Sequence, residues 1–141
     1  MKQIFALIGL LFLSLTAFGQ QPQTPEEQEK QLLEFIDKEV ERLTGALNLE
    51  YWQTFYVDST LVHDYHALQD EMKELQNAKV SNTDLYIAVQ DKWQEQIYNT
   101  FHRFFNEDQW KKYLKTGAAR EQKARDKRRE KAAKAAAKEE K

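Results

Sequence analysis

The sequence predicts an all-α protein, and two observations lead to this prediction. The 141 residues include only four Gly and two Pro, whereas a compact β protein needs many turns. Apolar residues also recur at steps of three and four, as from Val57 to Leu75, which is the period of an amphipathic helix. We expect a long antiparallel helical hairpin with flanking helices and a charged C-terminal tail that is helical or disordered.

Residues 1–19 are predicted to be a signal peptide. Lys2 gives a positive start, an apolar run covers residues 4–15, and Ala17-Phe18-Gly19 places small residues at a cleavage site. The run is shorter than the ~20 residues of a membrane span, so no integral membrane segment is expected after cleavage. We therefore expect cleavage after Gly19 and a periplasmic or secreted protein. Because the chain has no cysteine, disulfides, thiol chemistry and cysteine-held zinc are excluded.

A polar linker, residues 20–24, leads into a helical domain predicted over residues 25–116. Thr24 can cap the first helix, and Pro25 suits its first position. This helix should end near Gly45 to Asn48. The second should run from residues 48–50 to about residue 79, the third should follow residues 80–84, and Asn106 should cap a fourth. The exposed face of the second helix is expected to be acidic: Asp58, Asp64, Asp70, Glu71 and Glu74.

Charge separates this domain from the tail, residues 117–141. From Glu26 to Thr116 there are 10 Lys/Arg against 18 Asp/Glu, a net charge of −8, whereas the tail has 10 against five, a net charge of +5. After Gly117 the apolar residues are all alanines, so we expect the tail to have no face to bury and to be dispensable for folding. The basic residues lack interleaved aromatics and export argues against a genomic target, so no nucleic acid is expected as partner.

Neither catalysis nor a cofactor is expected. The chain has no glycine-rich phosphate loop and no Ser/His/Asp arrangement, and its carboxylates fall on charged helix faces. His63 and His66 share a helix face and Asp70 lies one turn beyond His66, which makes these three the candidates for a metal site. Local sequence fixes no further ligand, whereas tight zinc sites use at least three, so we expect surface or hydrogen-bonding histidines instead.

Aromatic residues are the most informative feature of the domain. Thirteen fall between Tyr51 and Tyr113, more than the small interior of a thin helical domain should hold. Most should be core, but some should be exposed or meet a second chain, because exposed aromatic patches mark binding surfaces. The residues predicted to form such a surface are Tyr51, Trp52, Phe55, Phe104, Phe105 and Trp110.

Two segments carry a resemblance to a known family. Leu47-Asn48-Leu49-Glu50-Tyr51-Trp52-Gln53 and Phe104-Phe105-Asn106-Glu107-Asp108-Gln109 each begin a predicted helix, and their glutamines are 56 residues apart. They resemble the paired Leu-Thr-x-x-Gln segments of the Spy and CpxP family of periplasmic proteins, with Glu50 and Asn106 where the family has Thr. The resemblance implies a thin all-α dimer acting as an ATP-independent chaperone or envelope-stress regulator, with metal binding in some relatives. The basic concave face of the family's chaperones contrasts with the acidic domain of this chain.

The function expected from these features is that of an exported cell-envelope binding protein that is not an enzyme. It would bind protein clients or a protein partner as a holdase-type chaperone or envelope-stress protein, and it could form a homodimer. Two alternatives stay open. One is a metal-binding or sensing periplasmic protein that uses His63 and His66. The other is a structural subunit of a larger envelope assembly.

Overall fold

The computed structural model describes residues 23–139. The predicted signal peptide, residues 1–19, and most of the predicted linker lie outside the described residues. The chain divides between Lys30 and Gln31 into two units. Only the opening turns of the first described helix belong to the first unit, and the tertiary contacts given below lie within the second.

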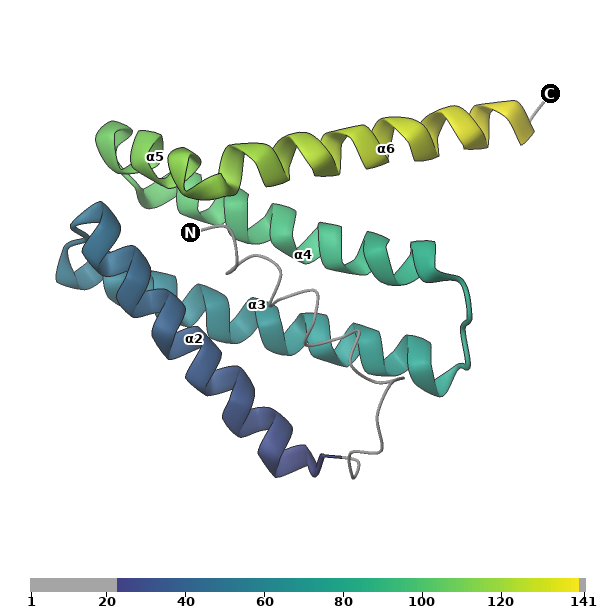
Figure 1. Cartoon of the computed structure of the whole chain (residues 1–141), viewed down its shortest axis with the longest axis horizontal. Helices are drawn as coiled ribbons and strands as arrows, with labels where there is room; N and C mark the ends of the chain where they lie inside the picture. The colour runs from purple at the N-terminus through teal and green to yellow at the C-terminus, as the bar shows by residue number, and fades with distance from the viewer. Residues whose placement is uncertain (1–22, 140–141) are drawn as a thin grey trace. The chain divides into compact units, whose positions relative to one another are not determined.

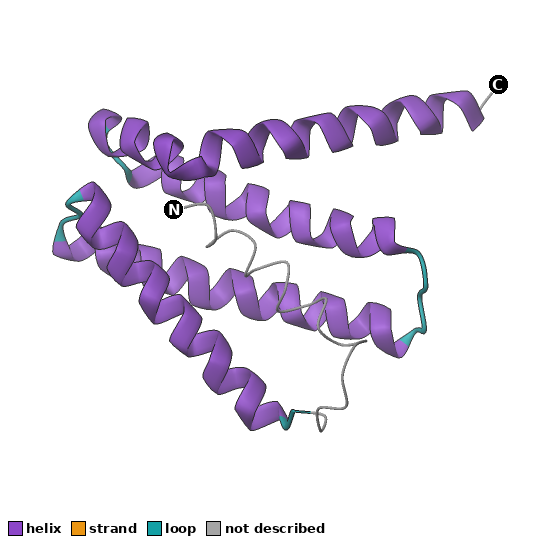
Figure 2. Ribbon diagram, viewed as in Figure 1, coloured by secondary structure: helices purple, strands orange, loops and turns teal. Residues whose placement is uncertain are grey.

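The described residues form helices joined by short loops, with no strand among residues 23–139 (Figure 2). In chain order the elements are α2 (Pro25–Leu47), α3 (Tyr51–Asn77), α4 (Thr83–Phe104), α5 (Glu107–Tyr113), the π-type turn η1 (Leu114–Ala118) and α6 (Ala119–Glu139). The all-α prediction is confirmed.

Capping side chains, and residues whose backbone is in the left-handed conformation, set the helix boundaries. At the start of α2, Thr24 Oγ1 accepts a hydrogen bond from Glu27 N at 3.2 Å, and a Glu27 carboxylate oxygen accepts one from Thr24 N at 3.0 Å. Asn48, with φ 51°, follows the last residue of α2, and Lys79, with φ 54°, follows the end of α3. Asn82 caps α4 by accepting from Asp84 N at 3.0 Å. Local sequence therefore sets each of these ends.

Helices α3 and α4 pair antiparallel (Figure 1). Near the start of α3, Gln53 donates to the Phe104 carbonyl at the end of α4, at 2.9 Å. Midway, Gln96 donates to Asp64 at 3.0 Å. The loop of residues 78–82 joins the two helices at their other ends.

A continuous apolar core joins α2, α3 and α4. Its buried members are Leu32, Ile36, Leu43, Leu47, Leu49, Val57, Leu61, Tyr65, Leu68, Met72, Ile97, Phe101 and Phe105. Most of the predicted α3 stripe is present, except that Leu75 is only half-buried. The buried residues of α4, Ile97 and Phe101, lie in its C-terminal half, whereas Leu85 and Ile87 near its start are exposed.

The C-terminal tail is helical, but the expectation that it has no face to bury is wrong. Gly117, with φ 110° and ψ −10°, breaks the helical path, and α6 then runs along α4 (Figure 1). Ala118 and Arg125 are both buried. The periodicity of large apolar residues missed this contact because charged side chains make it.

Candidate functional site

Two buried glutamines hold the starts of α3 and α5 together. Gln53 Nε2 donates to Gln109 Oε1 at 2.7 Å, and Gln109 Nε2 donates to Gln53 Oε1 at 2.8 Å. The two residues are only 3% and 6% exposed. The chain thus places side by side two segments whose glutamines are 56 positions apart, and we call this pair the glutamine clasp.

Each glutamine also caps its own helix. Gln53 Oε1 accepts from Glu50 N at 2.9 Å, and Gln109 Oε1 accepts from Asn106 N at 2.9 Å. Asn106 in turn accepts from Gln109 N at 2.9 Å, which completes a capping box. Local capping bonds therefore hold both amides in the orientation in which they pair, which lowers the entropic cost of ordering the buried pair.

Exposed aromatic rings surround the start of α3. Tyr51 is 92% exposed, Phe55 61%, Tyr56 53% and Trp52 46%. Phe104, at the end of α4, is half-buried beside them, with its ring centroid 6.0 Å from Tyr56 and 6.5 Å from Trp52. These five residues are called the aromatic patch below. Edge-to-face contacts within it, such as 5.8 Å between Phe55 and Tyr56, order rings that remain open to solvent.

Four of the six residues predicted to form a binding surface belong to this patch, and two do not. Phe105 is 7% exposed and packs against Phe101 at 5.2 Å and Tyr113 at 5.6 Å, so it is a core residue. Trp110 is half-buried, and its ring centroid lies 4.3 Å from that of His102 in a tilted arrangement and 4.9 Å from that of Tyr98 edge to face. Phe104 and Phe105 separate between surface and core because Phe104 is the last residue of α4, whereas Phe105 follows it with an extended backbone (φ −76°, ψ 138°).

Tyr56 belongs to the patch although it was not among the predicted surface residues. It lies one helical turn beyond Trp52, at a ring distance of 6.1 Å. Its spacing of four residues from Trp52 was a signal available in the sequence, because residues four apart share a helix face.

The predicted metal candidates do not converge on one point. His66 Nδ1 lies 2.5 Å from the Val62 carbonyl, and His63 Nδ1 lies 2.7 Å from Asp64. Asp70 is exposed. Within residues 23–139 there is no group of three His, Asp or Glu side chains arranged to hold a metal ion.

Asp64 is buried, which corrects its expected place on the exposed acidic face of α3. It is 3% exposed, and its Oδ1 accepts from Gln96 Nε2 across the α3–α4 interface. Tyr65, the next residue, is also buried and accepts from Gln94 at 3.2 Å. Burial raises the pKa of Tyr65 to about 12, so its hydroxyl is even harder to ionise than that of an exposed tyrosine. Polar groups, as well as apolar side chains, therefore join the two helices.

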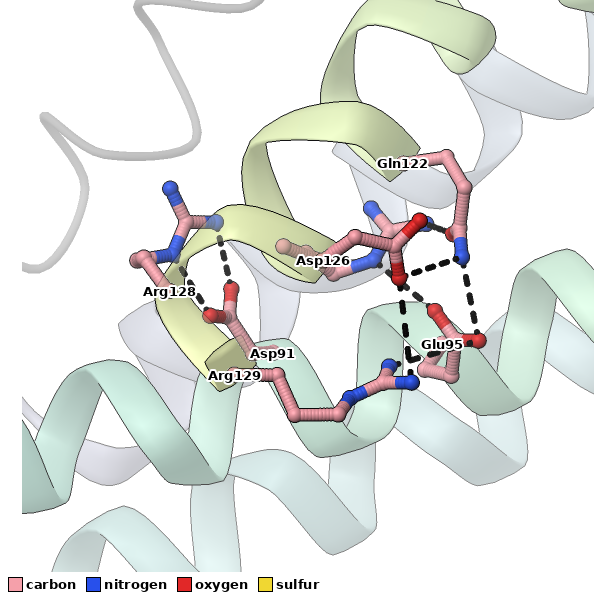
Figure 3. Close-up of polar contacts among 7 residues, drawn as sticks. Asp91, Glu95, Gln122, Asp126, Arg128 and Arg129 are labelled. Atoms are coloured by element: carbon pink, nitrogen blue, oxygen red, sulfur yellow. Dashed lines mark hydrogen bonds and ion pairs between the residues drawn. The ribbon is translucent and has the colours of Figure 1, made fainter. Parts of the chain in front are cut away.

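Arginine–carboxylate pairs attach α6 to α4 (Figure 3). Arg128 donates two hydrogen bonds to Asp91, from Nε to Oδ2 at 2.6 Å and from Nη2 to Oδ1 at 2.8 Å. Arg125, whose side chain is only 7% exposed, donates to Glu95 at 3.2 Å. Arg129 lies 3.6 Å from the same carboxylate. We call these contacts the α4–α6 seam.

Glu95 is the centre of the seam. Gln122 donates to it at 3.2 Å, and the Arg125 guanidinium that also donates to it lies 5.6 Å from the centre of the Tyr98 ring. Burial acts to raise the pKa of Glu95, but hydrogen bonds from Gln122 and Arg125 and the charges of Arg125 and Arg129 outweigh it. The pKa of Glu95 therefore lies below its ordinary value, and the folded protein favours the ionised carboxylate.

Comparison with known proteins assigns no family to this chain. No family model, curated protein or solved structure matches it. None of the helices between residues 23 and 139 is both long enough and apolar enough to cross a membrane. Any functional assignment must therefore come from the residues of the chain itself.

Proposed function

We propose that this chain is an exported binding protein of the cell envelope that holds apolar segments of other proteins against its aromatic patch, as an ATP-independent holdase does. The observation that carries this proposal is the exposure of four neighbouring aromatic side chains at 46–92%. Soluble proteins rarely leave such rings together in water unless the surface binds something. Aromatic side chains also dominate the binding energy of protein interfaces.

The position of the patch supports the same proposal. The glutamine clasp and its capping bonds hold the patch on the ends of α3 and α4, so the rings are presented from a fixed backbone. Presentation from a rigid scaffold limits the ordering cost of binding. The clasp also joins the two segments that resemble the Spy and CpxP family, which favours a related role for this chain.

The carboxylate of Glu50 and the net negative charge of the domain favour a basic client. Glu50 begins the helix that carries the patch, and Trp52 Nε1 donates to it at 2.6 Å. The domain as a whole has a net charge of −8 between Glu26 and Thr116. Electrostatic steering therefore favours unfolded segments that combine apolar side chains with lysine or arginine.

An aggregation assay with matched variants tests this proposal. The full chain should suppress light scattering by a thermally unfolded client, and Tyr51→Ser/Phe55→Ser should lose most of that activity. The control, Leu85→Ser/Ile87→Ser, removes exposed apolar side chains near the start of α4, and it should retain the activity. Both variants should keep the wild-type melting temperature because the changed residues are exposed. Equal losses in both variants, or no suppression by the wild type, would contradict the proposal.

Export is a separate part of the proposal and needs its own measurement. The motivation is the signal-peptide pattern of residues 1–19. Mass spectrometry of protein recovered from the envelope or medium should show a chain that begins at Gln20. A protein that keeps Met1 and remains in the cytoplasm would contradict export. The proposal that the aromatic patch binds proteins would not depend on that result.

A further inference from the structure

The α4–α6 contact differs from the rest of the fold because it depends on charge. From Ala119 to Glu139, α6 contains no apolar residue larger than alanine. What α6 places against α4 is the set of side chains of the seam, chiefly Arg125 and Arg128. By contrast, α2, α3 and α4 share a core of large apolar residues. The docking of α6 therefore lacks the burial of large apolar side chains that stabilises the other helix contacts.

We propose that α6 is a reversibly docked strap, and that the face of α4 beneath it is a binding surface for arginine-bearing helices that α6 occupies in cis. This surface consists of Asp91, Glu95 and Tyr98, and it shares no residue with the aromatic patch. The proposal is therefore independent of the holdase function, and it assigns a second interaction to the same chain.

Exposure of the seam makes the docking reversible. The Arg128 side chain is 44% exposed and that of Arg129 is 62% exposed, so salt screens both of their ion pairs. Each exposed ion pair shifts the equilibrium between docked and undocked α6 by a factor of about five or less. Of the three arginines of the seam, Arg125 alone has a buried side chain. Gly117 supplies the hinge, because its φ of 110° is open to glycine without strain.

The seam also specifies the chemistry of a partner. Arg125, Arg128 and Arg129 stand at i, i+3 and i+4 on α6, and they face carboxylates at i and i+4 on α4. A bidentate guanidinium–carboxylate pair depends on planar geometry that lysine does not offer. The Tyr98 ring adds a cation–π contact to one of the guanidinium groups. The fitting partner is therefore a helical protein segment with arginines at this spacing.

A distance measurement on the full chain tests whether the strap opens. The chain has no native cysteine, so spin labels at Ala88→Cys and Lys131→Cys, two exposed positions on α4 and α6, are unique. In low salt, double electron–electron resonance spectroscopy should give one short distance between the two spin labels. In 1 M NaCl a second, longer distance should appear, with the fraction of open molecules raised roughly fivefold or more. A distribution that does not change with salt would show that α6 is a fixed part of the fold.

Variants separate the arginine pairs from general charge. The seam variant is Arg125→Gln/Arg128→Gln/Arg129→Gln, and its matched control is Lys123→Gln/Lys127→Gln/Lys134→Gln, which removes the same charge from exposed positions of α6. The seam variant should be open in low salt, and the control should stay closed. If loss of the buried Arg125 unfolds the chain, Arg128→Gln/Arg129→Gln changes only exposed side chains and should still raise the open fraction. Equal opening in variant and control would overturn the proposal.

A peptide of residues 119–139 tests the binding surface. Labelled with a fluorophore, it should bind the full-length seam variant at least about tenfold more tightly than the wild type, because α6 at millimolar effective concentration competes in the wild type. A peptide with its three arginines replaced by lysine should bind more weakly. Adding Asp91→Lys/Glu95→Lys to the seam variant should abolish binding. Equal binding to wild type and seam variant, or binding that survives the lysine substitutions on α4, would refute the proposal.

Discussion

Replacing one glutamine of the clasp should destabilise the protein far more than replacing an exposed glutamine. Gln53→Ala removes four hydrogen bonds: those with Glu50 N, with the Phe104 carbonyl, and the two with Gln109. The side-chain NH2 group of Gln109 would keep one acceptor, the Asn48 carbonyl oxygen at 3.5 Å, which is at the limit of a hydrogen bond. A buried polar group is thus left poorly satisfied.

The magnitude follows from these contacts. A buried donor or acceptor left without a partner costs about 1–3 kcal/mol, and a lost cap costs about 1 kcal/mol. We therefore expect Gln53→Ala to lower the free energy of unfolding by ~2–4 kcal/mol. For a domain of this size, that is a fall in melting temperature of about 10 °C.

The assay is urea unfolding followed by circular dichroism, with Gln76→Ala as control. Gln76 lies on the same helix and is exposed, so its replacement should change the free energy of unfolding by less than about 0.5 kcal/mol. The double variant Gln53→Ala/Gln109→Ala should cost less than the sum of the two single variants, because each single change already breaks the shared pair. A Gln53→Ala variant as stable as the control would refute the clasp as a stabilising contact.

Three further predictions concern the core, the seam and the histidines. Leu68→Ala, at a fully buried position, should cost ~2–5 kcal/mol in urea unfolding, whereas Phe55→Ala should cost little. The pKa of Glu95 is lower in the folded protein than its value of about 4.5 in the unfolded chain. Ionised Glu95 therefore stabilises the fold above about pH 4.5, and this stabilisation is lost as the pH falls through the folded pKa. Stability measured from pH 7 to pH 3 should therefore fall less steeply in Glu95→Gln, and an unchanged slope would contradict this reading. Calorimetric titration with zinc should show no submicromolar one-to-one complex; such a complex, lost in His66→Ala, would revive the metal-binding alternative.

Local sequence determined the helix boundaries, because the signals that set them act within a few residues. Thr24 and Asn106 make the capping contacts expected at their helix starts, and Asn82 caps α4 through a contact that spans only two residues. The steps of three and four among apolar residues likewise gave the all-α class and most of the α3 core. A capping bond or a helical period needs no information from distant parts of the chain.

Tertiary structure decided which polar and aromatic side chains meet. The helical spacing of Asp64, three residues after Leu61 and four before Leu68, puts it on the apolar face of α3, but only the assembled fold shows that Gln96 lies opposite it as a hydrogen-bond partner. Phe104 and Phe105 are adjacent, yet only Phe104 reaches the surface patch. The burial of each side chain depends on which helix packs opposite it, and that is a property of the assembled fold.

The tail gives the clearest case of this division. Its composition alone determined that it would be helix-prone, basic and without large apolar residues. Its docking depends on an arginine at position 125 reaching a carboxylate at position 95. The periodicity of apolar residues indicates which helix face is buried by the hydrophobic effect. It gives no indication of a contact between charged side chains. Only the path of the chain after Gly117 brings those charges within reach of one another.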